Sequence, residues 1–535
     1  MYVLSYDIGT SGVKTCLYQV VDKKLLEVAS EMREYDLYIL PDGGAEQDPE
    51  QWWEALCSST QALRKEHAAE LDQVEGISFC SQMQSVVLVD KEGNALRNSM
   101  SYMDQRSTEQ LKKGLGSGVT VFGMNARKLA ISLRHTGAVS GSVKDPVWKY
   151  HWVRDNEPEI FAQVHSWLDV KDYLAARMTG ECKRSEDSAF TTLLLDIHSN
   201  PPQWSKEVCK LFDVNMKHLP EIIPSTGVVG LLREQQAKEL GLPAGIKVIS
   251  GGGDNSLIGV GAGATNIGDT HIYWGTSGWV ITVADKQFVD ISAMIAGIVG
   301  AERGRYNYFA ELETAGKCFQ WVRDHLALDE INIYLDRTDI NPEEADKEPE
   351  YKNLYSYMNK VIEQAEPGSG GVIFTPWLHG NRCPFEDPNA RGMFFNIGIE
   401  TGKTELLRAV IEGVCFHLRW FIETQEKKTP TAQVVRFVGG GALGEVTCQI
   451  LADILGRTVE TPADPQNIGS VGAAIVTACG LGVYETVSEG ASFIKAAKRY
   501  EPNPEVKAVY DRNFAAFKTL YKNNKKTFAL LNGGK

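Results

Sequence analysis

The amino-acid sequence predicts an α/β protein built from two related halves. The chain has 535 residues, which is too long for one ordinary hydrophobic core and suggests two domains of roughly 200–250 residues each. Apolar stretches of strand length are interleaved with segments of helical periodicity. The tetrapeptide Gly-Thr-Ser-Gly occurs at residues 9–12 and again at 275–278, each time between two predicted strands. We interpret this repeat as an internal duplication, with one copy at the start of each half.

The predicted elements of the first half begin with an antiparallel meander whose first turn is rich in glycine. A helix is predicted to start at residue 48, because Asp48 can cap it and Pro49 suits its first position. Four apolar residues follow at helical spacing and are expected in the core: Trp52, Trp53, Leu56 and Leu63. The predicted strands lie at residues 2–6, 15–21, 25–29, 74–80 and 86–89.

The second half repeats the alternation of strands and helices. Its predicted strands lie at residues 246–250, 270–274 and 434–438, and its clearest helices at 256–264 and 404–423. The acidic stretch 328–351 is predicted to be a surface excursion within this half, and the chain beyond about residue 486 to be a polar helical tail.

The composition excludes several classes of protein. With 43% apolar and 23% charged residues, the chain is neither disordered nor membrane-like. It carries 69 acidic against 55 basic side chains, a net charge of −14, so it has no general attraction to nucleic acids or anionic lipids. The ten cysteines form no C-x-x-C pattern, and the N-terminus has no basic segment typical of a signal peptide. We therefore expect a cytoplasmic protein with reduced thiols that binds neither nucleic acid nor membrane.

Three glycine-rich turns follow buried strands, at residues 9–12, 275–278 and 439–442. Such turns let the backbone approach an anion, and their successive N–H groups can form an anion-binding concavity. One such turn could serve chain geometry alone, but three, two of them nearly identical, favour a nucleoside triphosphate bound between the two halves. Neither a Walker motif nor a dinucleotide-binding fingerprint is present.

Two aspartates lie at strand ends beside these turns. Asp7 ends the first strand, and Asp254 follows three consecutive glycines after the strand at 246–250. A buried charge without a partner is costly, so packing explains neither residue well, although a turn-capping role stays open for each. Asp7 could hold hydrated Mg²⁺ near phosphates, and Asp254 could accept the proton of an attacking hydroxyl group.

These motifs together resemble the FGGY carbohydrate kinase family, within the actin-like ATPase superfamily, over residues 1–485. The two phosphate loops resemble residues 7–14 and 275–278, the catalytic segment 251–255 and the adenosine motif 439–442. The two family signatures resemble residues 146–156 and 392–412, the second with Asn396 where a glycine is usual.

The resemblance implies two duplicated actin-like, ribonuclease H-like domains flanking an interdomain cleft. The implied boundaries are a sugar-binding domain at 1–253, a nucleotide-binding domain at 254–485 and a helical tail at 486–535. ATP and Mg²⁺ are the implied cofactors, with Asp7 at the metal and Asp254 as the catalytic base. The implied nucleotide-binding residues are Gly9, Thr10, Ser11, Gly12, Lys14, Gly275, Thr276, Ser277, Gly439, Gly440, Gly441 and Ala442.

Within the family, residues 48–53, 388–392 and Gln82-Met83 are most similar to xylulose kinases, which implies a ketopentose acceptor such as xylulose. The chain departs from that subgroup at Gln84-Ser85, where His-Gly is usual, and at Tyr102-Met103, where Trp-Asn is usual. A polyol or another acyclic acceptor therefore stays open. A non-catalytic regulator would need a DNA-binding extension or the loss of Asp254, and neither is seen. The implied acceptor-binding residues are Gln82, Met83, Gln84, Asp104, Asp254 and Asn255, and a homodimer is a candidate assembly.

Overall fold

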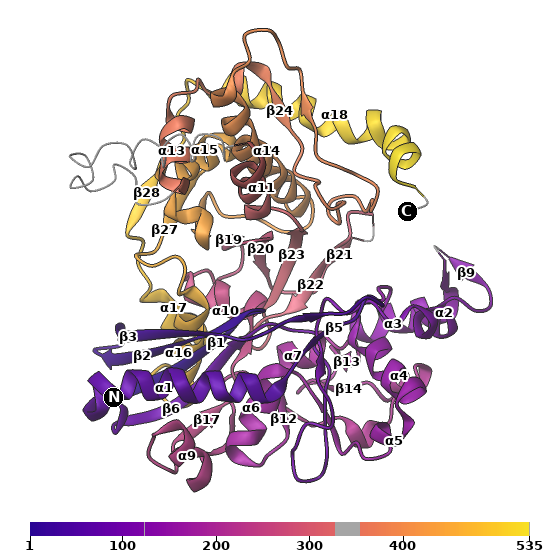
Figure 1. Ribbon diagram of the computed structural model, residues 1–535, viewed down its shortest axis with the longest axis vertical. Coiled ribbons are helices and arrows are strands. Elements are labelled where there is room, and N and C mark those ends of the chain that lie inside the picture. Colours follow the sequence, from indigo (N-terminus) through magenta and orange to yellow (C-terminus); the bar gives the residue numbers. More distant parts are fainter. Residues whose placement is uncertain (122, 291, 327–353, 534–535) are drawn as a thin grey trace, which may run out of the picture.

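Two mixed β-sheets, each covered by helices, form the two halves of the molecule (Figure 1). The computed structural model describes residues 1–121, 123–290, 292–326 and 354–533. The predicted acidic excursion at 328–351 lies outside the described residues. None of the described helices is both long enough and apolar enough to cross a membrane.

The first sheet has the strand order β16-β17-β6-β1-β2-β3, with β18 also paired to β6. The meander predicted at the N-terminus forms one side of it, from β1 near the middle to β3 at the edge: β1 and β2 are antiparallel, β2 and β3 are antiparallel, and β6 runs parallel to β1. The strands are β1 (Tyr2–Ile8), β2 (Gly12–Val21), β3 (Lys24–Glu34), β6 (Val74–Ser81), β16 (Val228–Leu231), β17 (Lys247–Ile249) and β18 (Gly252–Gly253).

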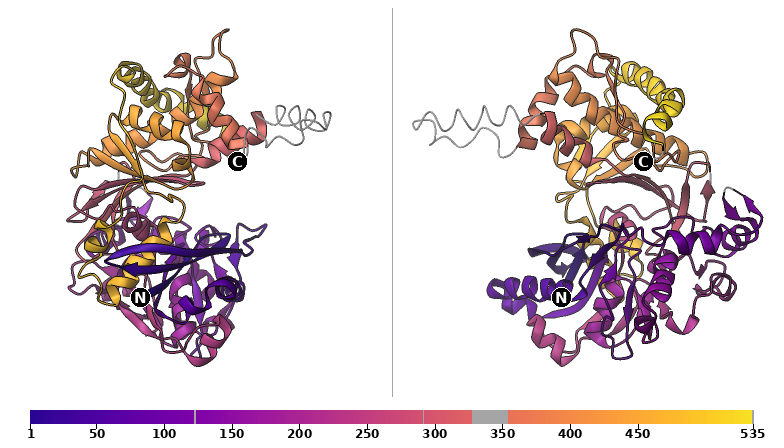
Figure 2. Two further views of the ribbon diagram at one scale, coloured as in Figure 1. Left: turned by 90° about the vertical axis from the view of Figure 1, so that its left-hand side faces the viewer. Right: turned by 45° about the vertical axis from the view of Figure 1, so that its right-hand side comes forward.

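The second sheet has the order β21-β22-β23-β20-β19-β26-β27-β28. Figure 2 shows its pink and orange strands above the first sheet. Two of its strands, β19 (Thr270–Trp274) and β26 (Val434–Val438), have the bounds that the sequence predicts. The others are β20 (Gly278–Ala284), β21 (Val289–Asp290), β22 (Ile295–Val299), β23 (Tyr306–Leu312), β27 (Thr458–Thr461) and β28 (Lys498–Tyr500).

The two sheets share one topology, which confirms the predicted duplication. The first contains β3-β2-β1-β6-β17 and the second contains β23-β20-β19-β26-β27 in the same relative directions. In each sheet, the strands before and after the Gly-Thr-Ser-Gly turn form an antiparallel hairpin, β1 with β2 and β19 with β20. The next two strands, β6 and β17 or β26 and β27, run parallel to the strand before the turn. The two Gly-Thr-Ser-Gly turns occupy equivalent positions, between β1 and β2 and between β19 and β20. The repeat in the sequence is therefore a repeat in structure.

Helix α1 (Pro49–Leu71) begins where the sequence predicts. Asp48 caps it by accepting a hydrogen bond from the Glu50 N–H, and Pro49 occupies its first turn. Trp52, Trp53, Leu56 and Leu63 are all buried against the first sheet, as expected from their helical spacing.

Helices α10 (Asp254–Gly261) and α16 (Ile468–Gly480) lie between the two sheets (Figure 1). The two helices pack so closely that a Cβ atom on Gly261 would lie 2.0 Å from the Ile468 carbonyl oxygen. One face of α16 packs on β1 and β2 through Ala474 and Ala478, so this part of the predicted second domain lies against the first sheet.

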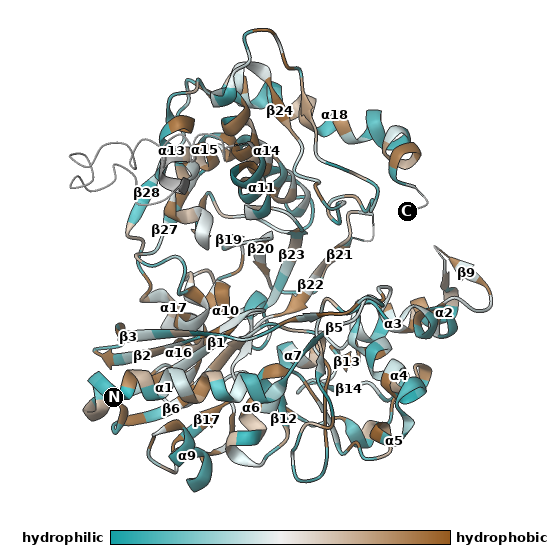
Figure 3. Ribbon diagram, in the orientation of Figure 1, coloured by the Kyte–Doolittle hydropathy of each residue, from teal (hydrophilic) through white to brown (hydrophobic). Residues whose placement is uncertain are grey.

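The larger core lies around the second sheet. Helices α14 (Lys403–Gln425) and α15 (Glu445–Leu455) cover the face of this sheet that α10 does not, and both carry hydrophobic residues (Figure 3). The predicted helical tail is helical only in part: it contains α17 (Val487–Ser492) and α18 (Lys507–Asn532), but β28 between them pairs with β27 as the edge strand of the second sheet. Among its described residues, this half also contains the helices α11 (Gly316–Leu326) and α13 (Leu354–Glu363).

The first half carries smaller elements around its sheet. A three-stranded sheet of β4 (Tyr38–Ile39), β5 (Ala45–Gln47) and β8 (Ser99–Met100) and a pair formed by β7 (Val87–Val89) and β11 (Ser166–Leu168) matter for the site below. Its other helices are α2 (Thr108–Leu115), α3 (Ala126–Thr136), α4 (Pro146–Asn156), α5 (Pro158–Phe161), α6 (Val170–Thr179), α7 (Glu186–Phe190), α8 (Lys206–Leu211) and α9 (Glu234–Leu240).

Candidate active site

Asp254 is the first residue of α10 and directly follows β18 of the first sheet. The three glycines before it are packed so closely against neighbouring residues that side chains would not fit there. Gly251 has a φ of +68°, and a Cβ atom there would lie 2.2 Å from the Phe79 carbonyl oxygen. A Cβ atom on Gly253 would lie 1.9 Å from Met83 Sδ. The glycine run therefore brings Asp254 beside Met83, one of the predicted acceptor residues.

The surroundings of Asp254 raise its pKa to about 7. Desolvation is the main cause, and the nearby charges of Asp7, Glu311 and Asp169 act in the same direction. The Asn255 N–H donates to Asp254 Oδ1 at 2.7 Å and opposes this rise. A carboxylate that titrates near neutrality is well matched to accept a proton from a hydroxyl group at physiological pH.

The first Gly-Thr-Ser-Gly turn, which is the first predicted phosphate loop, joins β1 to β2, and part of it is exposed. Gly9 and Ser11 are exposed, whereas Gly12 is buried with its Cα facing the Arg33 carbonyl oxygen. Asp7 pairs in register with Lys14 across the hairpin. Desolvation raises the pKa of Asp7 to about 6, and Cys80 and Lys14 oppose the shift. Loop and carboxylate thus lie together at the end of the first hairpin.

The second phosphate loop has the equivalent place in the second sheet. Thr276 is exposed. A backbone hydrogen bond holds the loop in place, because the Gly316 N–H donates to the Gly275 carbonyl at 2.9 Å. Tyr273, just before the loop, stacks on Trp279 with ring centroids 4.1 Å apart. Desolvation raises the pKa of Tyr273, and the charges of Asp254 and Asp7 add to the rise, so Tyr273 lies within electrostatic reach of both carboxylates.

The predicted adenosine turn packs beside the second phosphate loop, on Trp274. Gly439 has a φ of +88°, and a Cβ atom there would lie 2.6 Å from the Trp274 carbonyl oxygen. A Cβ atom on Gly441 would lie 2.5 Å from the Trp274 ring. Gly440 differs, because a Cβ atom there would meet nothing nearer than Gln466 Nε2 at 3.9 Å. Gly439 and Gly441 are therefore required by packing, whereas Gly440 leaves open space.

One segment, residues 464–470, links the adenosine turn to the first phosphate loop. The Gly439 N–H donates to the Pro465 carbonyl at 2.8 Å. Lys14 Nζ donates to Asn467 Oδ1. A Cβ atom on Gly469 would lie 2.4 Å from Asp7 Oδ2, so this carboxylate rests on the start of α16. All three glycine-rich turns are thereby joined by direct contacts.

Gln82 and Met83 lie next to the first phosphate loop. The Gln82 N–H donates to the Ile8 carbonyl at 2.8 Å, and Gln82 Nε2 donates to Gln47 Oε1 at 2.9 Å. Gln47 Nε2 in turn donates to the Thr10 carbonyl at 2.7 Å. Gln82 is 5% exposed, and its Oε1 has no hydrogen-bond partner. A buried acceptor without a partner is costly, and a substrate hydroxyl group could satisfy it.

Gln84 has the left-handed backbone conformation, with a φ of +65°. Its N–H donates to Asp169 Oδ2 at 2.9 Å, and its carbonyl accepts from Lys149 Nζ at 2.5 Å. Asn255, the last predicted acceptor residue, is half-buried in the first turn of α10, and its carbonyl accepts from Asn307 Nδ2 at 3.1 Å.

Asp104 is placed differently from the other predicted acceptor residues. It is fully buried, and both of its oxygens already accept hydrogen bonds within the protein, Oδ1 from the Arg106 backbone N–H at 3.1 Å. The Ala45 N–H donates to Oδ2 at 3.0 Å, and Arg106 Nη2 donates to the same oxygen at 2.7 Å. Arg106 also pairs with Glu46 at 2.6 Å. These hydrogen bonds mean that Asp104 stabilises the loop that carries it. Neither of its oxygens is left free to bind a ligand.

Three residues near the site were not predicted from the sequence. The Tyr102 hydroxyl is 3.2 Å from Thr10 Oγ1, and its pKa is raised by desolvation and by the charge of Asp254. Asp169 follows β11 directly, so the strand-end rule that singled out Asp7 also applies to it. Lys149 lies within the first family signature, but only the fold shows that its ammonium group reaches Gln84.

The carboxylates suit a magnesium ion that keeps its bound waters better than an ion coordinated only by protein side chains. Among the described residues, no group of three or more His, Cys, Asp or Glu side chains could hold a metal ion. Mg²⁺ in phosphate-transferring sites usually keeps several waters and takes one or two carboxylates plus phosphate oxygens. Asp7, desolvated and without an ion pair among the described residues, suits that role.

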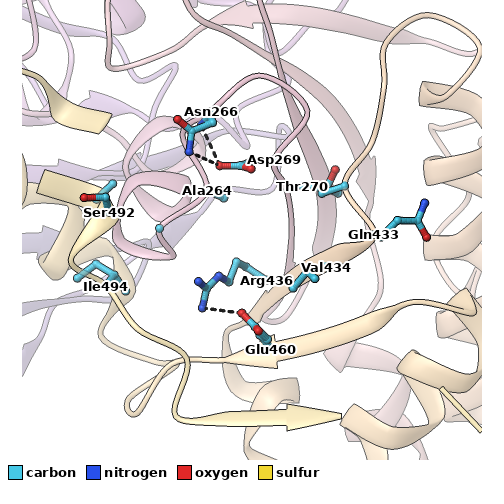
Figure 4. A pocket seen from close by; sticks show the side chains of 13 residues that line it. Ala264, Asn266, Asp269, Thr270, Gln433, Val434, Arg436, Glu460, Ser492 and Ile494 are labelled. Atoms are coloured by element: carbon cyan, nitrogen blue, oxygen red, sulfur yellow. Dashed lines mark hydrogen bonds and ion pairs between the residues drawn. The ribbon is translucent and has the colours of Figure 1, made fainter. Parts of the chain in front are cut away.

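A separate pocket of about 460 Å³ lies over β26 and β27 (Figure 4). Arg436 and Glu460 form an ion pair at 3.2 Å within it, and Asn266 donates to Asp269 at 3.1 Å. None of the residues predicted for nucleotide or acceptor binding lines this pocket.

Comparisons with known proteins bear on the family and the fold of this chain. The N-terminal domain model of the FGGY family of carbohydrate kinases matches residues 2–261, and the C-terminal domain model matches residues 271–481. The chain is 30% identical to a xylulose kinase from Lactococcus lactis subsp. lactis, over 98% of this chain and 97% of that protein. A ligand-bound xylulose kinase and a gluconate kinase, both from Lactobacillus acidophilus, each share its fold with a TM-score of 0.83 at 26% identity, with 99% of both chains covered.

The two domain models together cover most of the chain, and the two mixed sheets with their helices match a two-domain kinase fold. Kinases of this family use ATP to phosphorylate an alcohol group. The chain therefore belongs to the FGGY family of carbohydrate kinases and is a phosphotransferase with an alcohol acceptor.

Proposed function

We propose that this kinase transfers the γ-phosphoryl group of ATP to a hydroxyl group of a ketopentose, with xylulose as the first candidate. The observation that carries the reaction is the position of Asp254: its pKa is about 7, its charge interacts with Asp7 and with Tyr273, and it directly follows Gly253, which packs against Met83. The names of the relatives and the Gln82-Met83 segment support xylulose as the acceptor.

In the proposed mechanism, Asp254 takes the proton of the acceptor hydroxyl group while that oxygen attacks the γ-phosphorus atom. The new O–P bond forms as the bond between the γ-phosphorus and the β–γ bridging oxygen breaks, and ADP leaves. The raised pKa of Asp254, about 7, makes it a stronger base than an ordinary aspartate while leaving it substantially ionised at neutral pH.

The two Gly-Thr-Ser-Gly loops are proposed to stabilise the charge that develops on the transferring group. Their N–H groups, the Thr10 and Thr276 hydroxyls and the Lys14 ammonium group are the donors available there. When bound, Mg²⁺ supplies further charge stabilisation at the phosphate oxygens, and Asp7 is the residue that would hold its hydration shell. The open side of Gly440 is proposed to face adenosine.

On the acceptor side, Gln82 Oε1 is proposed to accept a hydrogen bond from a sugar hydroxyl group, because it is buried without a partner. Gln84 is proposed to select among sugars through its amide, which can both donate and accept. Asp104 is proposed to support the loop that carries Tyr102 instead of binding the acceptor directly.

The test is ADP release measured with a panel of acceptors: D-xylulose, D-ribulose, gluconate, glycerol and erythritol, each with MgATP. We expect the highest kcat/KM with a ketopentose. The highest value with gluconate, or with a polyol, would replace the proposed acceptor without changing the reaction. ADP release that no acceptor stimulates would contradict the kinase function of this chain.

A cytoplasmic location and a homodimeric assembly stay predictions from the sequence, and sedimentation analysis tests the second.

A further inference from the structure

The ammonium group of Lys149 is buried beneath the acceptor side of the site, where it joins two backbone segments. Lys149 lies on α4 and is 0% exposed. Its Nζ donates to the Gln84 carbonyl at 2.5 Å and to the Ser101 carbonyl at 2.9 Å. These two carbonyls belong to loops that are separate in sequence and that carry Gln84 and Tyr102 into the site.

Burying this charge is costly. Among the described residues, Lys149 forms no ion pair, and desolvation lowers its pKa to about 8, although Asp104, Asp169 and Asp145 favour the charged form from a greater distance. An uncharged side chain of similar length would fill the same space at a lower cost. Packing alone therefore does not account for a lysine at this position, whereas its two carbonyl acceptors do.

The Gln84 backbone needs to be held. A residue other than glycine at a φ of +65° is strained, and such conformations persist where the surroundings determine them. Gln84 is held from both sides, because its N–H donates to Asp169 and its carbonyl accepts from Lys149. The next N–H, that of Ser85, donates to Asp169 Oδ1 at 3.1 Å.

The loop that carries Tyr102 is held at the residue before it, Ser101. The Ser101 carbonyl accepts from the Asp104 N–H at 3.1 Å as well as from Lys149. Tyr102 follows directly, with its hydroxyl 3.2 Å from Thr10 Oγ1 of the first phosphate loop. One ammonium group thus sets the separation between the residue that replaces the usual histidine, Gln84, and the residue that replaces the usual tryptophan, Tyr102.

We propose that Lys149 is a positioning residue for the acceptor: it fixes the Gln84 and Tyr102 loops at the spacing that binds the sugar, without touching the sugar itself. This inference rests on the proposed function for the location of the acceptor. It does not depend on which sugar is bound.

The test compares Lys149→Met with Lys183→Met. Lys183 is a suitable control because its Nζ also donates to a backbone carbonyl, that of Val229, at 3.0 Å, and joins no predicted site segment. We expect Lys149→Met to raise the KM for the best acceptor in the panel by about tenfold or more, since small misplacements of binding groups carry large kinetic costs. The KM for ATP should change by less than about twofold in Lys149→Met, and neither constant should change more than that in Lys183→Met.

Hydrogen exchange separates this proposal from the choice of substrate. The Gln84 and Ser85 amides should lose protection in Lys149→Met and keep it in Lys183→Met, whichever acceptor is used and even if none is found. Unchanged exchange, or an equal rise in both KM values, overturns the positioning role. If Lys149→Met does not fold, Lys149→Gln, whose shorter uncharged side chain cannot reach both carbonyls, takes its place with the same readings, and an acceptor KM equal to that of the wild type overturns the proposal.

Discussion

Lys14 and Asn467 are 453 residues apart in sequence, yet the ammonium group of Lys14 donates to the side-chain oxygen of Asn467. This hydrogen bond ties the first phosphate loop to the start of α16, and two residues earlier the Pro465 carbonyl accepts from the Gly439 N–H at 2.8 Å. The parts proposed to bind the phosphates and the adenosine of one nucleotide are thus connected through one short segment.

Asn467→Ala removes the partner of Lys14 and leaves its ammonium group free to move. We expect the KM for ATP to rise by about fivefold, because the cation is no longer held in place, while the KM for the acceptor stays within about twofold of the wild type. Steady-state kinetics with each substrate varied in turn checks this. A rise confined to the acceptor KM would contradict it.

Gly440→Val tests the adenosine assignment. The protein itself leaves room for a side chain at this position, with the nearest atom 3.9 Å from the added Cβ. A valine there should fold normally and raise the KM for ATP by about tenfold or more, since the branched side chain occupies the proposed adenosine space. Gly398→Val, in an exposed loop where the nearest atom is 4.0 Å away, is the control and should leave the KM for ATP unchanged. Wild-type ATP dependence in a folded Gly440→Val protein would refute the assignment.

Asp254→Asn keeps the shape of the side chain and removes its basicity. We expect turnover to fall by at least about a hundredfold, with the KM for ATP nearly unchanged, because a positioned base contributes only to the chemical step. In the wild type, kcat/KM should decline as the pH falls below the Asp254 pKa of about 7. A variant that keeps more than about a tenth of wild-type turnover would exclude Asp254 as the base.

The same substitution should stabilise the protein in alkaline solution. The folded-state pKa of Asp254 is raised to about 7 from 3.8, so between these values the folded protein binds more protons than the unfolded chain. This group therefore makes the free energy of unfolding fall as the pH rises through that range. At about pH 8, Asp254→Asn should be more stable than the wild type by on the order of 1–4 kcal/mol, and the gain should shrink toward about pH 5. Urea unfolding at the two pH values measures this, and a gain that grows on acidification would contradict it.

Gln84→Ala tests the selection of the acceptor. Loss of the amide should change the order of preference within the sugar panel, because a site built to pair a hydroxyl group rejects analogues that lack it. Gln84→Gly should do the same without lowering the Tm, since glycine adopts a φ of +65° without strain. A uniform loss of efficiency with every sugar would show that Gln84 does not select among them.

The sequence alone predicted the repeat, several strand and helix boundaries and the family, because these depend on local patterns. Glycine-rich turns, strand-end aspartates and helical periodicity are set by neighbouring residues. The strands at 270–274 and 434–438 could therefore be placed to the residue, and the start of α1 could be assigned from Asp48 and Pro49.

Only the tertiary structure decided which of the predicted side chains are free to act. Asp104 and Gln82 both look available in the sequence, but Arg106 and Ala45 occupy the oxygens of Asp104, whereas Oε1 of Gln82 is buried without a partner. The pKa of Asp254 likewise depends on Asp7, Asp169 and Glu311. Desolvation, charge and hydrogen-bond occupancy arise between residues far apart in the chain, so they exist only once the two sheets have folded around α10 and α16.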